Sequence, residues 1–260
     1  MDARRKDILP ERERMKVGLF IPCYIDQFYP KVGIDTLQLL ERLDLEVVYP
    51  TNQTCCGQPI ANAGFENNSV KTVLHFAEQF KEYDYVVSPS GSCVYHVKNH
   101  YDIVPDSEAI EKVRGNTYEI CDFLVNILKI TDVGAIFRHK VGLLQSCHGL
   151  RGLRLGKSSE QVVDDYSVCA DLLRKVIGIE LLNLSRGDEC CGFGGTFSIT
   201  EAPLSVKMGS DRINDHLKNG VEVITATDMS CLMHMEGIIR RRKLPIRIEH
   251  IASILNSTTS

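Results

Sequence analysis

The chain has 260 residues, of which 43% are hydrophobic and 25% are charged, a composition typical of a globular protein with one large domain or two smaller ones. Its net charge of −4 gives no indication of nucleic-acid binding, and no apolar run is long enough to span a membrane. Ten cysteines are many for such a chain, and in a reducing compartment they favour metal or redox chemistry over disulfides.

The first 14 residues are highly charged and lack both hydrophobic periodicity and the apolar core of a signal peptide. We therefore expect residues 1–14 to form a disordered extension and the protein to be cytoplasmic. The rest of the first half alternates short β-rich runs with helical patterns. Strands are predicted at 17–21, 46–49 and 85–88, and helices at 33–43 and 69–83, the second with Ser69 as its N-cap.

The second half repeats this alternation. Strands are predicted at 141–144, 180–184, 222–225 and 246–248, and helices at 160–178 and 202–217. Strand–helix–strand alternation implies right-handed crossovers and a parallel sheet in each half. We therefore predict an α/β fold made of two pseudo-repeated, Rossmann-like domains at residues 15–137 and 138–255.

Four cysteines recur in the same order in both halves, each at or just beyond the end of a predicted strand. The first half has Cys23, Cys55, Cys56 and Cys93, and the second half has Cys147, Cys190, Cys191 and Cys231. Glycine follows each adjacent pair, and His96 and His234 stand three residues after the last cysteine of each set. Composition alone predicts only about 0.03 Cys-Cys-Gly triplets in such a chain, so two of them in register are not accidental.

The two remaining cysteines, Cys121 and Cys169, fall within helical patterns and have no counterpart in the other half. We interpret them as buried apolar residues of the core. The other eight cysteines are then the candidates for metal or redox chemistry.

The carboxyl ends of parallel strands meet at one edge of a sheet, where open α/β sheets bind ligands. Three distant segments can therefore bring four thiolates to one point in each half. Such a set binds zinc or an iron–sulfur cluster, but structural zinc typically uses compact C-x₂₋₄-C knuckles, which this chain lacks. Because adjacent cysteines can reach different irons, we favour an iron–sulfur cluster over zinc or thiol–disulfide chemistry. A ferredoxin-type cysteine run is also missing, so clusters of that type must come from a partner.

The motif Cys-x₃₁-Cys-Cys-Gly-x₃₅-Cys-x₂-His of the first half, which the second half repeats with longer spacings, resembles the cysteine-rich CCG domain. That domain occurs in the disulfide-reducing subunit of heterodisulfide reductase, in the iron–sulfur subunit of glycolate oxidase and in the lactate utilisation protein A family. The last is the most similar, through QTCCGQP at 53–59, PSGSC at 89–93, ECCGFGGTF at 189–197 and DMSC at 228–231. The resemblance covers residues 15–255 and implies two CCG halves.

The resemblance also implies a function. It implies an electron-transfer component of a complex that oxidises L-lactate to pyruvate, inactive by itself, with a ferredoxin-type iron–sulfur subunit and a third lactate-utilisation protein as partners. It implies one or two [4Fe–4S] clusters per chain. The ligands of one cluster would be Cys23, Cys55, Cys56 and Cys93, and those of a second cluster, or of its degenerate remnant, would be Cys147, Cys190, Cys191 and Cys231.

One position departs from the pattern of the heterodisulfide reductase family, in which the last motif is Cys-x-x-Cys. Here His96 and His234 stand where that family has a cysteine. A histidine can ligate iron or donate a hydrogen bond to a cluster sulfur, and both interpretations stay open.

Two other functions stay open as well. A catalytic subunit that reduces disulfides would turn over alone with an artificial donor, although the missing fifth cysteine disfavours it. A zinc-stapled scaffold or redox sensor would contain zinc without sulfide, or a cluster whose loss alters partner binding. Lactate rests on the resemblance alone, because the cysteines specify a redox centre and no substrate.

Overall fold

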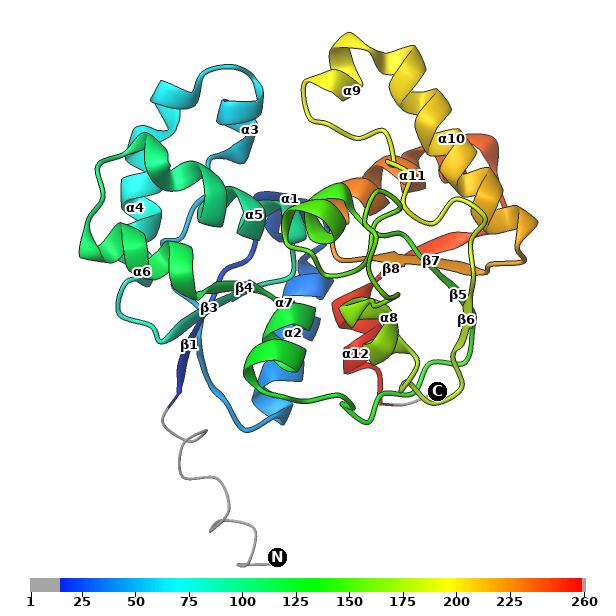
Figure 1. The fold of residues 1–260 in the computed structure, drawn as a ribbon, viewed down its shortest axis with the longest axis horizontal. Coiled ribbons are helices and arrows are strands. Elements are labelled where there is room, and N and C mark those ends of the chain that lie inside the picture. Colours follow the sequence, from blue (N-terminus) through cyan, green and yellow to red (C-terminus); the bar gives the residue numbers. More distant parts are fainter. Residues whose placement is uncertain (1–14, 259–260) are drawn as a thin grey trace, which may run out of the picture.

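In the computed structural model, which describes residues 15–258, two four-stranded parallel sheets lie side by side in one α/β molecule (Figure 1). The strand order is β2-β1-β3-β4 in the first sheet and β6-β5-β7-β8 in the second. The strands are β1 (Lys16–Leu19), β2 (Glu46–Val48), β3 (Tyr85–Ser88), β4 (Thr117–Glu119), β5 (Lys140–Leu143), β6 (Glu180–Leu182), β7 (Val223–Ala226) and β8 (Arg247–His250). The predicted fold of two parallel-sheet halves is confirmed, while the expectation for residues 1–14 lies outside the described residues.

Helices connect the strands in both halves. Those of the first half are α1 (Cys23–Phe28), α2 (Pro30–Arg42), α3 (Gln58–Asn62), α4 (Val70–Phe80), α5 (Gly91–His100), α6 (Glu108–Asn116) and α7 (Ile120–Asp122), which continues as a π-helical turn over Phe123–Ile127. Those of the second half are a π-helical turn at His148–Gly152, α8 (Val168–Leu173), α9 (Phe197–Thr200), α10 (Ala202–Lys218), α11 (Met229–Arg242) and α12 (Ile251–Asn256). Two 3₁₀ turns lie at Glu66–Ser69 and Tyr101–Ile103.

The same tetrapeptide, KVGL, forms β1 and β5, which hold the same inner place in their sheets. Its glycine lets a side chain of another segment approach the strand closely. A Cβ on Gly18 would lie 2.8 Å from the ring of Tyr83, and a Cβ on Gly142 would lie 2.3 Å from Nδ1 of His216. The repeat therefore includes a packing requirement as well as the cysteines.

The predicted helix over 160–178 is wrong in its first and last parts, because α8 covers only Val168–Leu173. Val162 and Val163, which supplied apolar positions of the pattern, are exposed. The helix begins after Ser167, whose side chain caps it by accepting a hydrogen bond from the backbone N–H of Ala170 at 3.2 Å. The pattern counted two valines of a surface loop as helical.

Two further differences lie in the first half. Ser69 does not cap α4, because its backbone is helical and its hydroxyl donates to the carbonyl of Glu66 at 2.6 Å. Strand β4 (Thr117–Glu119) was not predicted, because three residues between two helices are too few to show an alternating pattern.

The two halves are joined through their last helices. α12 packs on α2 of the first half, and α7 packs on α8 of the second half (Figure 1). Buried side chains of both sheets, such as Leu19 and Ile224, belong to one continuous hydrophobic core. A separate core around Phe20, Phe76 and Phe80 lies within the first half. The halves cannot separate without exposing the apolar faces of their last helices.

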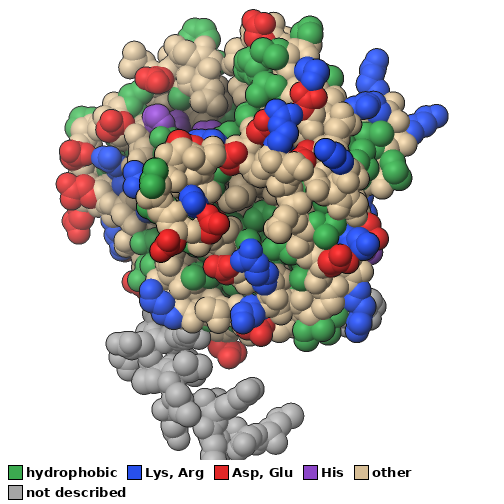
Figure 2. Space-filling model, turned by 45° about the vertical axis from the view of Figure 1, so that its right-hand side comes forward, with side chains coloured by type: hydrophobic (Ala, Val, Ile, Leu, Met, Phe, Trp, Pro, Cys, Tyr) green, Lys and Arg blue, Asp and Glu red, His purple; other side chains and the backbone are tan. Residues whose placement is uncertain are grey.

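Among residues 15–258, no helix combines the length and apolar character that crossing a membrane requires. On the face shown in Figure 2, basic and acidic side chains are mixed over the middle, whereas acidic side chains gather at the left edge and basic ones at the upper right.

Candidate metal centres

Four thiols of the first half meet at the carboxyl end of its sheet. Cys23 begins α1 after β1, Cys55 and Cys56 lie between β2 and α3, and Cys93 lies in the first turn of α5 after β3. Hydrogen bonds between thiols link Cys23 to Cys55, Cys55 to Cys56, and Cys56 to Cys93. The structure thus brings together the four cysteines singled out in this half, which we call the first quartet.

The sulfur atoms of the first quartet differ in exposure and protonation. Cys56 and Cys93 are buried, whereas Cys23 and Cys55 are partly exposed, with their Sγ atoms 3.8 Å apart. Hydrogen bonds from the thiols of Cys23 and Cys56, and from the backbone N–H of Gly57, lower the pKa of Cys55 to about 3. The bond to Cys55 and burial raise the pKa of Cys23. One sulfur is therefore held as a thiolate, the form that binds metals.

The second half repeats this arrangement. Cys147 follows β5, Cys190 and Cys191 lie between β6 and α9, and Cys231 lies in the first turn of α11. Thiol hydrogen bonds again link them in this order. Those from Cys147 and Cys191, together with the N–H of Gly192 at 3.3 Å, lower the pKa of Cys190 to about 2. We call these four cysteines the second quartet.

The glycine after each cysteine pair makes the turn that aims a backbone N–H at sulfur. Gly57 and Gly192 have φ angles of +94° and +89°, in the left-handed region that favours glycine. At Gly192 space is limiting too, because a Cβ would lie 2.4 Å from the carbonyl oxygen of Ser205. At Gly57 the nearest atom to such a Cβ, on Ser69, is 3.4 Å away.

The two histidines differ in their contacts. His96 is buried beside the first quartet, its Nε2 has no hydrogen-bond partner within residues 15–258, and burial lowers its pKa to about 4. His234 is partly buried, its Nε2 lies 3.2 Å from the carbonyl oxygen of Ser205, and burial lowers its pKa. Both rings are therefore neutral at pH 7, and a neutral ring nitrogen can bind a metal or donate one hydrogen bond.

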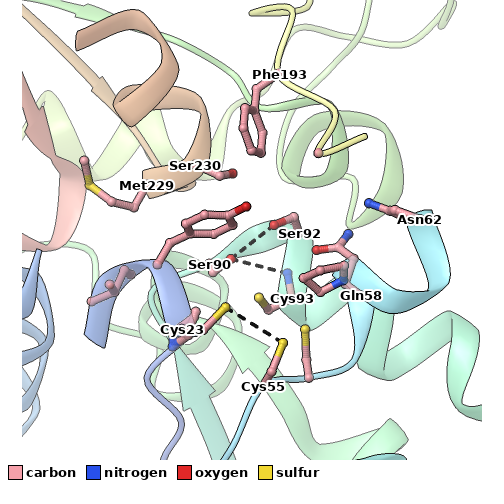
Figure 3. A pocket seen from close by; sticks show the side chains of 16 residues that line it. Cys23, Cys55, Gln58, Asn62, Ser90, Ser92, Cys93, Phe193, Met229 and Ser230 are labelled. Carbon is pink, nitrogen blue, oxygen red and sulfur yellow. Dashed lines mark hydrogen bonds between the residues drawn. The ribbon is translucent and has the colours of Figure 1, made fainter. Parts of the chain in front are cut away.

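The first quartet opens on a pocket at the boundary between the halves (Figure 3). Ser90 and Tyr24 line it from the first half, and Phe193 and Met229 line it from the second. The rings of Tyr24 and Phe193 meet edge to face, with centroids 5.9 Å apart. Sequence reasoning missed this pocket because its walls come from positions that the cysteine repeat does not relate to one another.

The donor set of each quartet fits two kinds of metal centre. Four thiols, some of which accept backbone N–H bonds, are typical ligands of an iron–sulfur cluster. Two thiolates on one tetrahedral ion stand about 3.8 Å apart when each metal–sulfur bond is about 2.3 Å, and the Cys23–Cys55 distance of 3.8 Å has this value. A cluster with one thiolate on each iron would require these two sulfur atoms to move apart.

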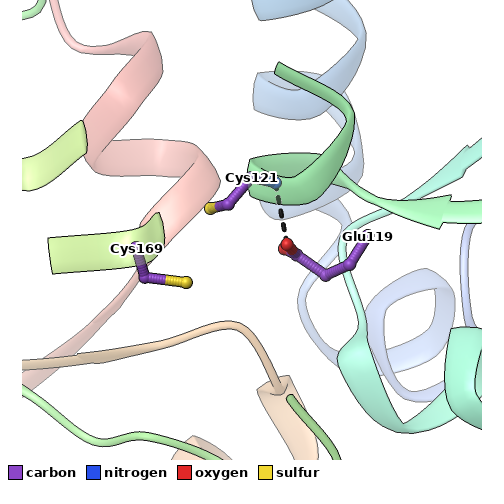
Figure 4. A group of neighbouring side chains, drawn as sticks. All are labelled: Glu119, Cys121 and Cys169. Carbon is purple, nitrogen blue, oxygen red and sulfur yellow. Dashed lines mark hydrogen bonds between the residues drawn. The ribbon is translucent and has the colours of Figure 1, made fainter. Parts of the chain in front are cut away.

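The structure also brings together Cys121 and Cys169, which lie on helices of opposite halves. Both are buried, as expected, and Glu119 lies beside them (Figure 4). Burial raises the pKa of Glu119 to about 8. No local pattern marks this group, because its members come from β4 and α7 of the first half and from α8 of the second, which meet only when the halves pack.

Comparison with known proteins agrees with this architecture. The model of the cysteine-rich domain matches residues 17–98 and again 141–236. Lactate utilization protein A of Halalkalibacterium halodurans is 40% identical over 246 residues, covering 93% of this chain and 97% of that protein. The protein of that name from Bacillus licheniformis is 40% identical over 247 residues, covering 94% and 100%. Among solved structures, the alignment with glutamate racemase from Francisella tularensis covers 94% of this chain and 79% of that protein. Its TM-score of 0.36 and its 9% identity are too low to support an inference. The chain therefore belongs to the lactate utilization protein A family and contains the cysteine-rich domain twice.

Proposed function

We propose that this chain is an iron–sulfur electron-transfer subunit of a system that oxidises L-lactate to pyruvate. The pair of thiol quartets, in equivalent places of two packed halves, carries the proposal. The name of the relatives, lactate utilization protein A, supports lactate as the substrate of the system.

In this proposal the first quartet holds one cluster, most simply [4Fe–4S], and the second quartet holds another. When bound, each cluster supplies one-electron redox chemistry. Lactate loses two electrons and two protons when its hydroxyl carbon becomes the carbonyl of pyruvate. Two one-electron centres in one chain match that requirement.

The protein's own groups have two tasks in this scheme. The N–H groups of Gly57, Gly192 and Phe193 donate to cysteine sulfur at 3.3–3.4 Å, and hydrogen bonds of this kind tune the reduction potential. Cys23 and Cys55 remain partly exposed at the pocket of Figure 3, where electrons can enter.

The lining of that pocket also suggests a division of labour. Its polar side chains are hydroxyls, thiols and amides, and it contains no carboxylate, histidine, lysine or arginine among the described residues. It therefore lacks a cation for the carboxylate of lactate and a conventional base for its hydroxyl proton. We assign substrate oxidation to a partner, which the family resemblance suggests is a ferredoxin-type subunit acting with a third protein.

The first experiment measures iron, zinc and acid-labile sulfide in protein purified without oxygen, together with its EPR spectrum. We expect about eight iron and eight sulfide per chain. Cys55→Ser and Cys190→Ser should each lower both to about four, whereas the matched control Cys121→Ser should keep the wild-type iron content. If neither quartet variant loses iron, the ligand assignment is wrong.

A second experiment tests the role in lactate oxidation. The chain alone should not reduce an artificial acceptor with lactate, and adding the ferredoxin-type subunit and the third protein should restore electron flow. Lactate-dependent reduction by the partners at the same rate without this chain would contradict an electron-transfer role.

The 3.8 Å spacing of Cys23 and Cys55 favours one alternative, a scaffold with zinc in place of each cluster. That alternative predicts about two zinc per chain, no sulfide and no EPR signal on reduction. The metal and sulfide analysis therefore separates the two functions directly.

A further inference from the structure

We infer that Glu119, Cys121 and Cys169 form a third metal site, separate from both quartets, that binds Zn²⁺ between the two halves of the chain. We call these three residues the junction trio. Their ligand atoms, one carboxylate oxygen and two sulfurs, all lie within 4.8 Å of one another. Ligand atoms of a tetrahedral zinc site stand about 3.5 to 3.8 Å apart, so shifts of about 1 Å complete the geometry.

The trio is held by elements of both halves. Glu119 ends β4, Cys121 follows in α7, and Cys169 lies in α8 (Figure 4). Oε2 of Glu119 accepts backbone N–H bonds from Cys121 at 2.8 Å and from Asp122 at 3.3 Å, which fixes the carboxylate beside the thiols. A metal ion bound here would cross-link α7 to α8, one of the two contacts between last helices and the opposite half.

One oxygen of this carboxylate has no role in the fold. Glu119 is completely buried, and among residues 15–258 no nitrogen or oxygen donates a hydrogen bond to its Oε1; the thiol of Cys121 is the hydrogen-bonding group beside the carboxyl. An unpaired buried polar atom costs about 1 to 3 kcal/mol, more if it is charged, so such atoms call for an explanation. Zn²⁺ shared with the two sulfurs supplies the missing partner.

The electrostatic surroundings favour a cation. Asp122 and Asp228 are acidic side chains outside the trio whose charges act on it. Two thiols and a carboxyl surrounded by further acids are a poor place for an anion and a good one for a divalent cation. Zinc accepts this mixture of sulfur and oxygen ligands.

Room for a fourth ligand lies next to Cys169. A small pocket there is lined by Cys169 and mainly by leucine side chains, with Gln145, Ser146 and Thr227 as its polar members. One water molecule is the largest fourth ligand that this space admits.

The contact between α12 and α2 is the counterpart, in the repeat, of the contact between α7 and α8, so the two contacts can be compared within one molecule. Leu172-Leu173 of α8 corresponds to Leu39-Leu40 of α2 in the repeat. In this alignment Thr36 is equivalent to Cys169. His250 is equivalent to Glu119, and Ala252 to Cys121, because each pair holds the same place at the start of its helix. Thr36 and Ala252 are fully buried in that contact. Packing of a last helix on the opposite half therefore does not require two cysteines, and their presence at only one contact indicates another role.

The test measures the zinc content of the purified protein, with the metal content of the two quartets left as it is isolated. We expect about one zinc per chain that survives dialysis against a weak chelator. Cys169→Ser and Cys121→Ser should lower it at least tenfold while iron is unchanged. Glu119→Gln, which keeps an oxygen to cap α7, should weaken zinc binding with little change in secondary structure.

Two controls separate metal binding from folding and from the proposed function. Leu172→Ala, a buried change on the same helix, should reduce stability but retain zinc. Cys55→Ser should lose iron but retain zinc, so the trio can be established even if the quartets hold no cluster.

Three results would each overturn the inference. One is wild-type protein that contains no zinc and takes none up from added Zn²⁺ under reducing conditions. Another is zinc that persists in Cys169→Ser, which would locate it in a quartet. The third is a mass lower by two hydrogens with Cys121 and Cys169 in one cross-linked peptide, which would identify a disulfide.

Discussion

The buried imidazole of His216 makes the stability of this protein depend on pH below neutrality. His216 lies on α10 against Gly142, and in the described part of the chain neither of its ring nitrogens has a hydrogen-bond partner. Burial lowers its pKa to about 3, compared with about 6.5 in an unfolded chain. The unfolded state therefore binds a proton that the folded state excludes. The stability that depends on a neutral His216 is fully present above about pH 6.5. It decreases as the pH falls from about 6.5 to the folded-state pKa.

The size of the effect follows from the two pKa values. At about pH 5 the unfolded imidazole is protonated and the folded one is not, which lowers the free energy of unfolding by about 2 kcal/mol relative to about pH 7.5. His250, whose pKa burial lowers to about 4, adds about 2 kcal/mol by the same calculation. Together these two histidines should therefore lower the wild-type free energy of unfolding by about 4 kcal/mol between about pH 7.5 and about pH 5.

Replacing His216 by leucine removes the proton-binding site and two unpaired nitrogens. Between about pH 7.5 and about pH 5, we expect the free energy of unfolding to fall by about 2 kcal/mol less in His216→Leu than in the wild type. Urea unfolding followed by circular dichroism under anaerobic conditions measures this difference, and all other titrating groups cancel between the two proteins. Equal losses in both proteins would refute the reasoning, because they would mean that the folded state admits the proton.

Three further predictions concern the quartets. Gly192→Ala should destabilise the protein more than Gly57→Ala, by about 1 to 3 kcal/mol in urea unfolding, because only Gly192 combines the left-handed backbone with a steric clash. His96→Leu should change one of two EPR signals and spare the other, and an unchanged spectrum would exclude a contact with the centre. Asp228→Ala should lower iron in the first quartet more than in the second, since its Oδ1 accepts the N–H of Ser92 at 2.9 Å; iron analysis in the Cys55→Ser and Cys190→Ser backgrounds assigns the loss.

The parts of the fold that can be predicted from the sequence are those with local signals. The inner strands of each sheet are apolar runs closed by cysteine, and α4 and α10 have regular apolar periodicity, so the sequence predicts all of these. The two Cys-Cys-Gly turns need glycine for a local backbone reason, which is visible in the sequence. Because strand ends of a parallel sheet converge, this information suffices to predict which cysteines meet.

Contacts between the halves cannot be predicted in this way. The pocket of the first quartet combines Tyr24 with Phe193, and the junction trio combines Glu119 with Cys169. Each of these contacts depends on how two sheets pack, which no period of one segment encodes. The loop around Val162 fails for the opposite reason, since its local pattern is helical but its side chain faces solvent.

Asp228 shows that the halves depend on each other despite the repeat. It occupies the place after β7 that Ser90 occupies after β3, and the two residues form a β-bridge between the halves. Its carboxylate accepts hydrogen bonds from the hydroxyl of Ser90 at 3.0 Å and from the N–H of Ser92, in the first turn of the helix that carries Cys93. A residue of the second half thus orients a cysteine of the first quartet, and serine, with its shorter side chain, does not provide the same contact in return. The repeated positions bring the thiols together, whereas the positions that differ between the halves set the surroundings of each quartet. Differences in potential or access between the two centres must therefore come from those unrepeated positions.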